Sequence, residues 1–409
     1  MKNHRILPMR GKKSSPAAFA RRMRLALRNF IFAVAALGIV SSGLTAEAQT
    51  YTVLHSFNGT TDGYYTYGTL VIDPVGNLYG IASHGGDMTC GNQGCGVVFK
   101  IDPSGNETVL HVFESNGTDG VTPQGGLIRD SSGNLYGTTS FGGTTNSGTI
   151  FKLDSSNTET TLYNFMGTSD GNLPFALTLD SAGNIYGLAA YGGHTACRCG
   201  TLFELSATGV FKTLHTFWGV PDGSFPDGVP MLDGAGYIYG STGTGGKYGK
   251  GAIFRYSISG GQYSVISLKG APGADGAGPI SESPAGDFYI LTGGGTNTVG
   301  MAIKVHPWGT RLGAFNFGTT SGAYPIGPLI FDSVGNGYGT TEDGGTSLNY
   351  GVIFKFDSNL NETVLYTLTD GSNGENFNSG LVADPAGNLY GTALWGGASQ
   401  SGVVFKFTP

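Results

Sequence analysis

Residues 126–165 read GLIRDSSGNLYGTTSFGGTTNSGTIFKLDSSNTETTLYNF, four short apolar segments separated by Gly, Asn, Asp and Ser. The segments cover residues 126–129, 135–139, 149–153 and 160–165, and each has the length and the β-branched or aromatic content of a strand. Between the first two, Asp130 begins a turn and Gly133 supplies the left-handed backbone that the turn needs. This stretch therefore predicts four antiparallel strands joined in sequence order.

The same unit recurs along the chain. Counterparts of the tyrosine in Asn-Leu-Tyr-Gly follow one another at spacings of 57, 50, 53, 50, 49 and 52 residues, at Tyr79, Tyr136, Tyr186, Tyr239, Tyr289, Tyr338 and Tyr390. A four-stranded sheet cannot bury its faces alone, so repeats of this size stack face to face as propeller blades do. The sequence predicts an all-β fold, a seven-bladed β-propeller with four-stranded antiparallel blades.

The two ends of the repeat region complement each other. Residues 51–57 resemble the fourth strand of a unit, whereas the last unit ends after its third strand at residues 403–407. Pairing these two strands would leave no exposed sheet edge. We therefore expect the N-terminal strand to complete the C-terminal blade and close the ring.

Residues 1–48 have the composition of a signal peptide. Nine Lys and Arg residues precede an apolar run from Phe30 to Val40, which is too short to span a bilayer, and an Ala46-Glu47-Ala48 cleavage site follows. We expect Sec-type export with cleavage after Ala48, a propeller over residues 49–409, and a secreted or periplasmic monomer without a membrane span.

The expected mature chain is acidic. Cleavage removes nine of the 22 Lys and Arg residues and one of the 28 Asp and Glu residues, which leaves 13 basic and 27 acidic side chains and a net charge of −14. A polyanion is a poor partner for such a surface, so no nucleic acid is expected to bind.

The repeat also has a family resemblance. Units that contain Leu-His-x-Phe, Thr-Asp-Gly, Asp-x-x-Gly-Asn-Leu-Tyr-Gly, Gly-Gly and Gly-Thr-Ile-Phe-Lys-Leu-Asp resemble the GloVer-type tandem repeat of exported bacterial proteins. The resemblance covers the mature chain, implies structural roles for the repeat residues, and implies no established activity. Some such proteins end in an anchor, whereas this chain ends at Phe407-Thr408-Pro409, which favours a free product. A kelch-like propeller is the second resemblance, but the tryptophan that the kelch repeat has in its fourth strand is absent from this sequence.

One rim of the predicted propeller is variable. The loops after the second and fourth strands share a rim, and binding residues concentrate on such loops. The residue before Gly-Gly differs among units, with His84, Phe141, Tyr191, Thr244, Asp343 and Trp395. Aromatic side chains there can stack on sugar rings or pack on a peptide, so these six are the candidate ligand-binding residues. The alternative is that they cover the seams between blades.

Two sets of aspartates fit turns better than ligand binding. Asp-x-x-Gly-Asn between the first two strands is turn chemistry, and calcium binding is the less favoured alternative. Asp-Gly recurs after the fourth strand and could form a ring of carboxylates, but it is also a common turn pair, at Asp62, Asp119, Asp170, Asp222, Asp275 and Asp370.

The four cysteines lie in the variable loops. Export makes disulfides the default state, and we expect Cys90 to pair with Cys95. A Cys197–Cys199 pair stays open because so short a ring strains disulfide geometry. The two pairs lie a blade apart, which disfavours zinc, and we expect neither a metal nor a cofactor.

Three classes of function remain. The favoured one is a non-catalytic propeller that binds a glycan or a peptide or protein on the variable rim. The others are a structural or cell-surface assembly protein, and a propeller lyase or hydrolase that uses His84 or His194 in the variable loops. No His-Glu-x-x-His motif occurs.

Overall fold

The computed structural model describes residues 49–247, 249–266, 277–293, 299–307, 309–346 and 349–409. Contacts divide the chain into two units, Met1–Ala48 and Gln49–Pro409. The expected signal peptide and its cleavage site precede the described residues, so its assignment stays a prediction.

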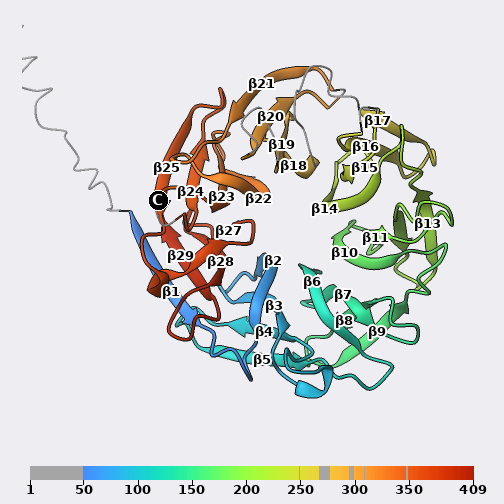
Figure 1. Ribbon diagram of the computed structural model, residues 1–409, viewed down its shortest axis with the longest axis horizontal. Helices are drawn as coiled ribbons and strands as arrows, with labels where there is room; N and C mark the ends of the chain where they lie inside the picture. Colours follow the sequence, from blue (N-terminus) through green and yellow to red (C-terminus); the bar gives the residue numbers. More distant parts are fainter. Residues whose placement is uncertain (1–48, 248, 267–276, 294–298, 308, 347–348) are drawn as a thin grey trace, which may run out of the picture. The chain divides into compact units, whose positions relative to one another are not determined.

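The second unit is the seven-bladed propeller that the repeat predicted (Figure 1). Blades 1 to 3 are complete four-stranded antiparallel sheets. Blade 1 contains β2 (Tyr64–Ile72), β3 (Leu78–His84), β4 (Val97–Ile101) and β5 (Glu107–Val112). Blade 2 contains β6 (Gly120–Arg129), β7 (Leu135–Gly142), β8 (Thr149–Leu153) and β9 (Glu159–Asn164). Blade 3 contains β10 (Asn172–Leu179), β11 (Ile185–Tyr191), β12 (Thr201–Leu205) and β13 (Phe211–Thr216).

Blades 4 to 6 repeat this order. Blade 4 contains β14 (Ser224–Leu232), β15 (Tyr237–Thr244), β16 (Ala252–Ser257) and β17 (Tyr263–Ile266). Blade 5 contains β18 (Ala277–Glu282), β19 (Phe288–Thr292), β20 (Met301–Val305) and β21 (Arg311–Asn316). Blade 6 contains β22 (Ala323–Phe331), β23 (Gly337–Asp343), β24 (Val352–Phe356) and β25 (Glu362–Thr367).

Blade 7 joins the two ends of the propeller unit. Its innermost strand is divided into β26 (Glu375–Phe377) and β27 (Val382–Ala383), which pair with β28 (Leu389–Trp395), and β29 (Val403–Thr408) follows. The outer edge of β29 pairs antiparallel with β1 (Thr50–Ser56), from Thr50 opposite Thr408 to Ser56 opposite Val403 (Figure 1). Ring closure is therefore confirmed. Two short 3-10 helices, η1 (Met88–Cys90) and η2 (Gly371–Asn373), lie in loops.

The innermost strands are longer than the sequence indicated. We expected the first strand of blade 2 to begin at residue 126, but β6 begins at Gly120. Gly and Pro residues in this segment do not end the strand, because a bulge between Gln124 and Ile128 absorbs them. Equivalent bulges interrupt the innermost strands of the other complete blades, so each of these strands bends around the central channel.

Packing explains the Tyr-Gly and Leu-x-x-Phe motifs. Gly80 pairs with Phe99 across β3 and β4, and a Cβ built on Gly80 would lie 2.4 Å from the Phe99 ring. Glycine is thus required where the ring lies over the neighbouring strand. The Phe57 ring, directly after the outer strand of blade 7, meets Phe99 edge-on at 5.1 Å, so the repeat phenylalanines join adjacent blades.

The Asp-x-x-Gly-Asn segments are hydrogen-bonded turns. Asp73 Oδ1 accepts the backbone N–H groups of Val75 and Asn77, and Oδ2 accepts Asn77 Nδ2 at 2.8 Å and the Tyr79 hydroxyl at 3.1 Å. Partial burial works to raise the pKa of Asp73, but the hydrogen bonds led by Asn77 outweigh it and hold the pKa below its ordinary value. These contacts account for the recurrence of the motif.

Candidate functional site

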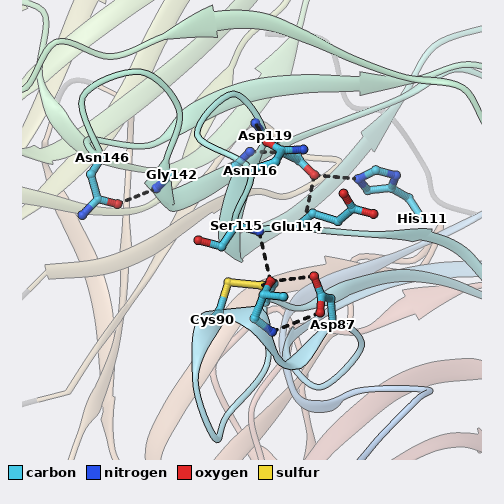
Figure 2. Close-up of a disulfide and its surroundings, with 12 residues drawn as sticks. Asp87, Cys90, His111, Glu114, Ser115, Asn116, Asp119, Gly142 and Asn146 are labelled. Carbon is cyan, nitrogen blue, oxygen red and sulfur yellow. Dashed lines mark hydrogen bonds and ion pairs between the residues drawn. A yellow bond between two sulfur atoms is a disulfide. The ribbon is translucent and has the colours of Figure 1, made fainter.

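The Asp-Gly aspartates stabilise the loops in which they lie. Figure 2 shows Asp119 against the backbone of Glu114, whose N–H donates to Asp119 Oδ2 at 3.0 Å, while His111 Nε2 lies 3.4 Å from the same oxygen. Asp62, Asp119 and Asp170 are all buried. His55 and His215 face Asp62 and Asp222 in the same way, so these histidines connect the outer strands to the loops. Asp275 lies outside the described residues, and the described carboxylates do not form an exposed ring.

The cysteines form two disulfides within the variable loops. Cys90 is bonded to Cys95, as expected, and Cys197 is bonded to Cys199, which the sequence had left open. The Cys90 loop also contacts the next loop, because Thr89 Oγ1 accepts the Ser115 N–H (Figure 2). Both disulfides therefore hold loops on the variable rim.

The six candidate residues all lie on this rim, at the ends of second strands rather than in free loops. His84, Tyr191, Thr244, Asp343 and Trp395 are the last residues of β3, β11, β15, β23 and β28, and Phe141 is the last but one of β7. The aromatic rings are partly exposed, with exposed fractions of 42% for Phe141, 44% for Tyr191 and 37% for Trp395. Because strands fix their backbones, the rings project from rigid positions.

A second set of rim residues was missed by the sequence analysis. Near the start of each innermost strand, one residue that is not glycine has a left-handed backbone, with φ of 55–58°, at Tyr65, Thr122, Leu173, Phe225, Tyr324 and Asn376. The corresponding position of blade 5 precedes Ala277 and lies outside the described residues. We call these six the mouth residues, because they lie near the starts of the innermost strands, which surround the centre of the ring (Figure 1).

Three of the candidate residues contact mouth residues of the following blade. The Trp395 ring meets Tyr65 edge-on at 4.5 Å, and the Tyr191 ring meets Phe225 at 5.1 Å. In a polar version of the same contact, Asn376 Nδ2 donates to Asp343 Oδ1 at 2.9 Å. The candidate residues therefore cover seams in part, but together with the mouth residues they also form a partly exposed surface.

Contacts to the preceding blade hold the left-handed backbone in place. The Phe225 N–H donates to the Cys199 carbonyl at 2.9 Å, and the Tyr324 N–H donates to Val299 at 2.7 Å. Pro226, directly after Phe225, packs against Gly200, where an added Cβ would lie 2.4 Å from the proline ring. The mouth position could have been found in the sequence, because a residue directly before proline recurs a few positions after Asp-Gly.

The innermost strands enclose a central cavity of about 290 Å³. All seven blades contribute to its wall. The bulge residues Tyr67, Gln124, Phe175, Ile326 and Asn378 line it, each two residues after a mouth residue. Asp227, whose side chain is exposed, has the equivalent position in blade 4, and desolvation by the surrounding protein raises its pKa to about 6 although a hydrogen bond with Ser241 opposes the shift.

The two loop histidines are not brought together. His84 belongs to blade 1 and packs on Tyr64 and Tyr65, with ring centroids 5.2 and 5.0 Å apart. Burial lowers the pKa of His84, although a hydrogen bond with Gln93 opposes the shift. His194 belongs to blade 3 and packs on the exposed Trp218 at 4.0 Å. They offer two separate imidazoles rather than one acid–base pair.

Within the described part of the chain, no group of three or more His, Cys, Asp or Glu side chains is arranged to hold a metal ion. No helix among the described residues is long and apolar enough to cross a membrane.

Comparison with known proteins agrees with the repeat and the fold. The family model described as Gloeobacter/Verrucomicrobia repeat matches residues 37–198, 88–283 and 226–409. A search of curated proteins finds no significant match.

Two similar solved structures are extracellular domains of bacterial proteins. The extracellular domain assigned to a hybrid two-component system of B. thetaiotaomicron is 14% identical, with a TM-score of 0.55 over 88% of this chain and 41% of that one. That of a one-component system of the same organism is 12% identical, with a TM-score of 0.56 over 88% and 40%. The chain thus spans about two-fifths of their length, and the likeness is one of fold.

Proposed function

The chain belongs to the Gloeobacter/Verrucomicrobia repeat family, and we propose that it is an exported, non-catalytic binding protein that captures neutral glycans on its variable rim. The observation that carries the proposal is the rim surface itself. Phe141, Tyr191 and Trp395 are held at strand ends, and each remains more than a third exposed. Exposed aromatic rings bordered by polar residues are typical of ligand-binding surfaces.

The chemistry of the rim favours sugars over peptides. Aromatic faces complement the apolar faces of sugar rings, and Thr244, Asp343 and Asn376 add polar groups that can bond hydroxyls. The exposed rings stand on separate blades, whereas a peptide is commonly bound by a free strand edge or one continuous groove. The net charge of −14 expected after cleavage also disfavours acidic glycans.

An extracellular setting supports the proposal. Residues 1–48 have signal-peptide composition, both disulfides suit an oxidising compartment, and the similar solved structures are extracellular domains.

The experiment is to apply the exported protein to arrays of neutral polysaccharide fragments and of unmodified peptides. We expect glycan capture that the Phe141→Ala, Tyr191→Ala and Trp395→Ala triple variant loses. Removing partly exposed rings should cost little stability, about 0.5–1.5 kcal/mol for each aromatic contact broken. Val75→Ala and Val334→Ala, exposed in turns of the opposite rim, are matched controls that should retain capture.

Capture of peptides alone would assign the rim to another ligand class. If the triple variant loses roughly 3–5 kcal/mol for each ring removed, which is what a buried ring contributes, the rings are seam packing and the proposal fails.

A further inference from the structure

The loops of the variable rim have four positions at which the residue type differs from seam to seam. They are the candidate residue before Gly-Gly, the third residue after it, the residue after the buried Phe or Leu that follows the outer strand, and the mouth residue of the next blade. All four positions are described at five of the seven seams. Among these five, only the seam between blades 3 and 4 has an aromatic side chain at every position, namely Tyr191, His194, Trp218 and Phe225.

The fold of the repeat does not require these rings. The seam after blade 6 has polar residues at the same positions, namely Asp343, Thr346, Thr369 and Asn376. The seam after blade 7 has Trp395 and Tyr65 at its two inner positions, but Ala398 and Asn58 at the two outer ones. The four rings between blades 3 and 4 are therefore a property of that seam and not of blade packing in general.

The four rings form two pairs on the same two loops. The Tyr191 and Phe225 ring centroids lie 5.1 Å apart, and those of His194 and Trp218 lie 4.0 Å apart. Phe225 belongs to the innermost strand β14, whereas Trp218 closely follows the outer strand β13, so one pair lies nearer the centre of the ring and the other nearer its outside (Figure 1). Tyr191 and His194 are three residues apart, which keeps their Cα atoms within about 11 Å.

The outer pair is exposed although its backbone is held in place. The Trp218 side chain is 60% exposed while it packs on His194. The Trp218 N–H donates to Asp222 Oδ2 at 3.0 Å. On the other loop the His194 carbonyl accepts the Arg198 N–H at 2.8 Å, and the Cys197–Cys199 disulfide lies in the same turn. A ligand that covers the Trp218 ring would therefore lose little affinity to the ordering of these loops.

Two separate ring pairs suit a chain of sugar rings. Protein partners commonly bind one continuous apolar patch, whereas here Gly192 and Gly193 stand between Tyr191 and His194. A glycan offers a series of apolar ring faces, and each face can cover one aromatic pair. Thr195 and Arg198, which are exposed in the same loop, add donors for its hydroxyl groups.

We propose that an extended neutral glycan lies along the seam between blades 3 and 4, with one sugar ring on the Tyr191–Phe225 pair and another on the His194–Trp218 pair. This inference rests on the proposed function and specifies its site, because it adds Trp218 and Phe225 to the binding residues. It also makes recognition depend on chain length. A short fragment covers one pair, whereas a longer chain covers both.

The test measures the binding of neutral β-1,4-linked fragments of glucose, mannose and xylose, from disaccharide to hexasaccharide, by isothermal titration calorimetry. We expect the affinity of at least one series to rise with length. Trp218→Ala should abolish this rise and weaken hexasaccharide binding at least ten-fold, a change that a merely structural residue would not produce. Met166 has the position of Trp218 in the preceding seam and is 54% exposed, so Met166→Ala is the matched control and should bind like the wild type.

Fluorine NMR of protein labelled with 5-fluorotryptophan reports the contact directly. The chain has three tryptophans, and Trp218→Phe identifies the Trp218 signal by its loss. We expect the hexasaccharide to shift this signal. Trp218→Phe keeps an aromatic ring and should retain most of the affinity. Because the Trp218 side chain is mostly exposed, Trp218→Ala should melt close to the wild-type temperature.

The outcomes separate this seam from the rim as a whole. If the Phe141, Tyr191 and Trp395 triple variant loses glycan capture but Trp218→Ala binds every fragment like the wild type, the seam proposal is wrong and rim capture stands. A bound hexasaccharide that leaves the Trp218 signal unshifted, or an affinity that does not change with length, also overturns the seam proposal alone. If no neutral glycan binds the wild-type protein, both proposals fail.

Discussion

Individual residues on the variable rim are held at an energetic cost. A left-handed backbone costs an L-residue about 1–2 kcal/mol, and glycine or asparagine would reduce that cost. Yet Tyr65, Leu173, Phe225 and Tyr324 have this conformation and carry bulky side chains. Backbone strain of this kind clusters at functional sites, which is consistent with binding at the mouth of the channel.

The strain can be measured by comparing two substitutions at Tyr324, whose φ is 55° and whose side chain is 40% exposed. Tyr324→Gly and Tyr324→Ala both remove the ring, but only glycine relieves the backbone. We expect Tyr324→Gly to be more stable than Tyr324→Ala by about 1 kcal/mol in chemical denaturation.

Val364 supplies the control for this comparison. Its side chain is similarly exposed, at 37%, but it lies in the outer strand β25 and its φ is not positive. There the order should reverse, with alanine more stable than glycine by about 0.5–1 kcal/mol. The same order at both sites would mean that the mouth backbone is unstrained.

At the scale of elements, one strand decides whether the blades form a closed ring. β1 lies at the start of the propeller unit but is the outer strand of the last blade, and Tyr51 and Val53 pack on the core that contains Phe405 and Phe407. Tyr51 also stacks on Tyr366 of blade 6, with centroids 4.3 Å apart. β1 thus joins two blades as well as two chain ends.

Deleting β1 should destabilise the whole propeller. The deletion exposes the edge of β29 and the apolar side chains beneath it, so the protein should aggregate or lose several kcal/mol of stability. Size-exclusion chromatography and thermal melting measure both effects. A synthetic peptide of residues 49–58 should restore the monomer, whereas a truncated protein that stays monomeric and melts like the full chain would refute the closure.

At the scale of the whole molecule, charge and burial set the pH of greatest stability. Desolvation by the surrounding protein raises the pKa of Glu362 to about 7 and that of Asp227 to about 6, so the folded state binds these protons more tightly than the unfolded state does. Their contribution to stability is complete below the ordinary carboxyl pKa and is lost as the pH rises through 6 and 7. The turn aspartates, such as Asp73, act in the opposite direction, because their lowered pKa makes them stabilising above pH 4.

We therefore expect stability to be greatest near pH 5 and to fall towards pH 8. Glu362→Gln should flatten this fall by roughly 1–3 kcal/mol, because the neutral amide does not have to be buried as an anion. Urea unfolding at pH 5 and pH 8 compares the two proteins. An unchanged difference between the two pH values in Glu362→Gln would exclude this carboxyl as the source.

Local sequence determined the architecture because each blade is specified by contacts within the repeat and with its immediate neighbours. The turn aspartates, the Tyr-Gly pairs and the repeat phenylalanines each make their decisive contacts within one unit or to the next. The spacing therefore predicted seven blades, and the complementary strands at the two ends of the repeat region predicted the β1–β29 closure. The residues before Gly-Gly were also placed on the correct rim. The start of β6 was missed because its Gly and Pro residues are tolerated only by a bulge that pairing with β7 stabilises.

Only the tertiary structure decided what surrounds the channel. The left-handed backbone of Phe225 depends on a hydrogen bond to Cys199 of the preceding blade, which no local preference for glycine or asparagine predicts. The cavity wall is assembled from the innermost strands of all seven blades, which meet around one axis. Phe175 and Asn378 lie 203 positions apart along the chain and line one cavity only when the ring closes. The repeated residues determine the fold of each blade. The residues that differ among blades come together only around the central cavity, where all seven blades meet.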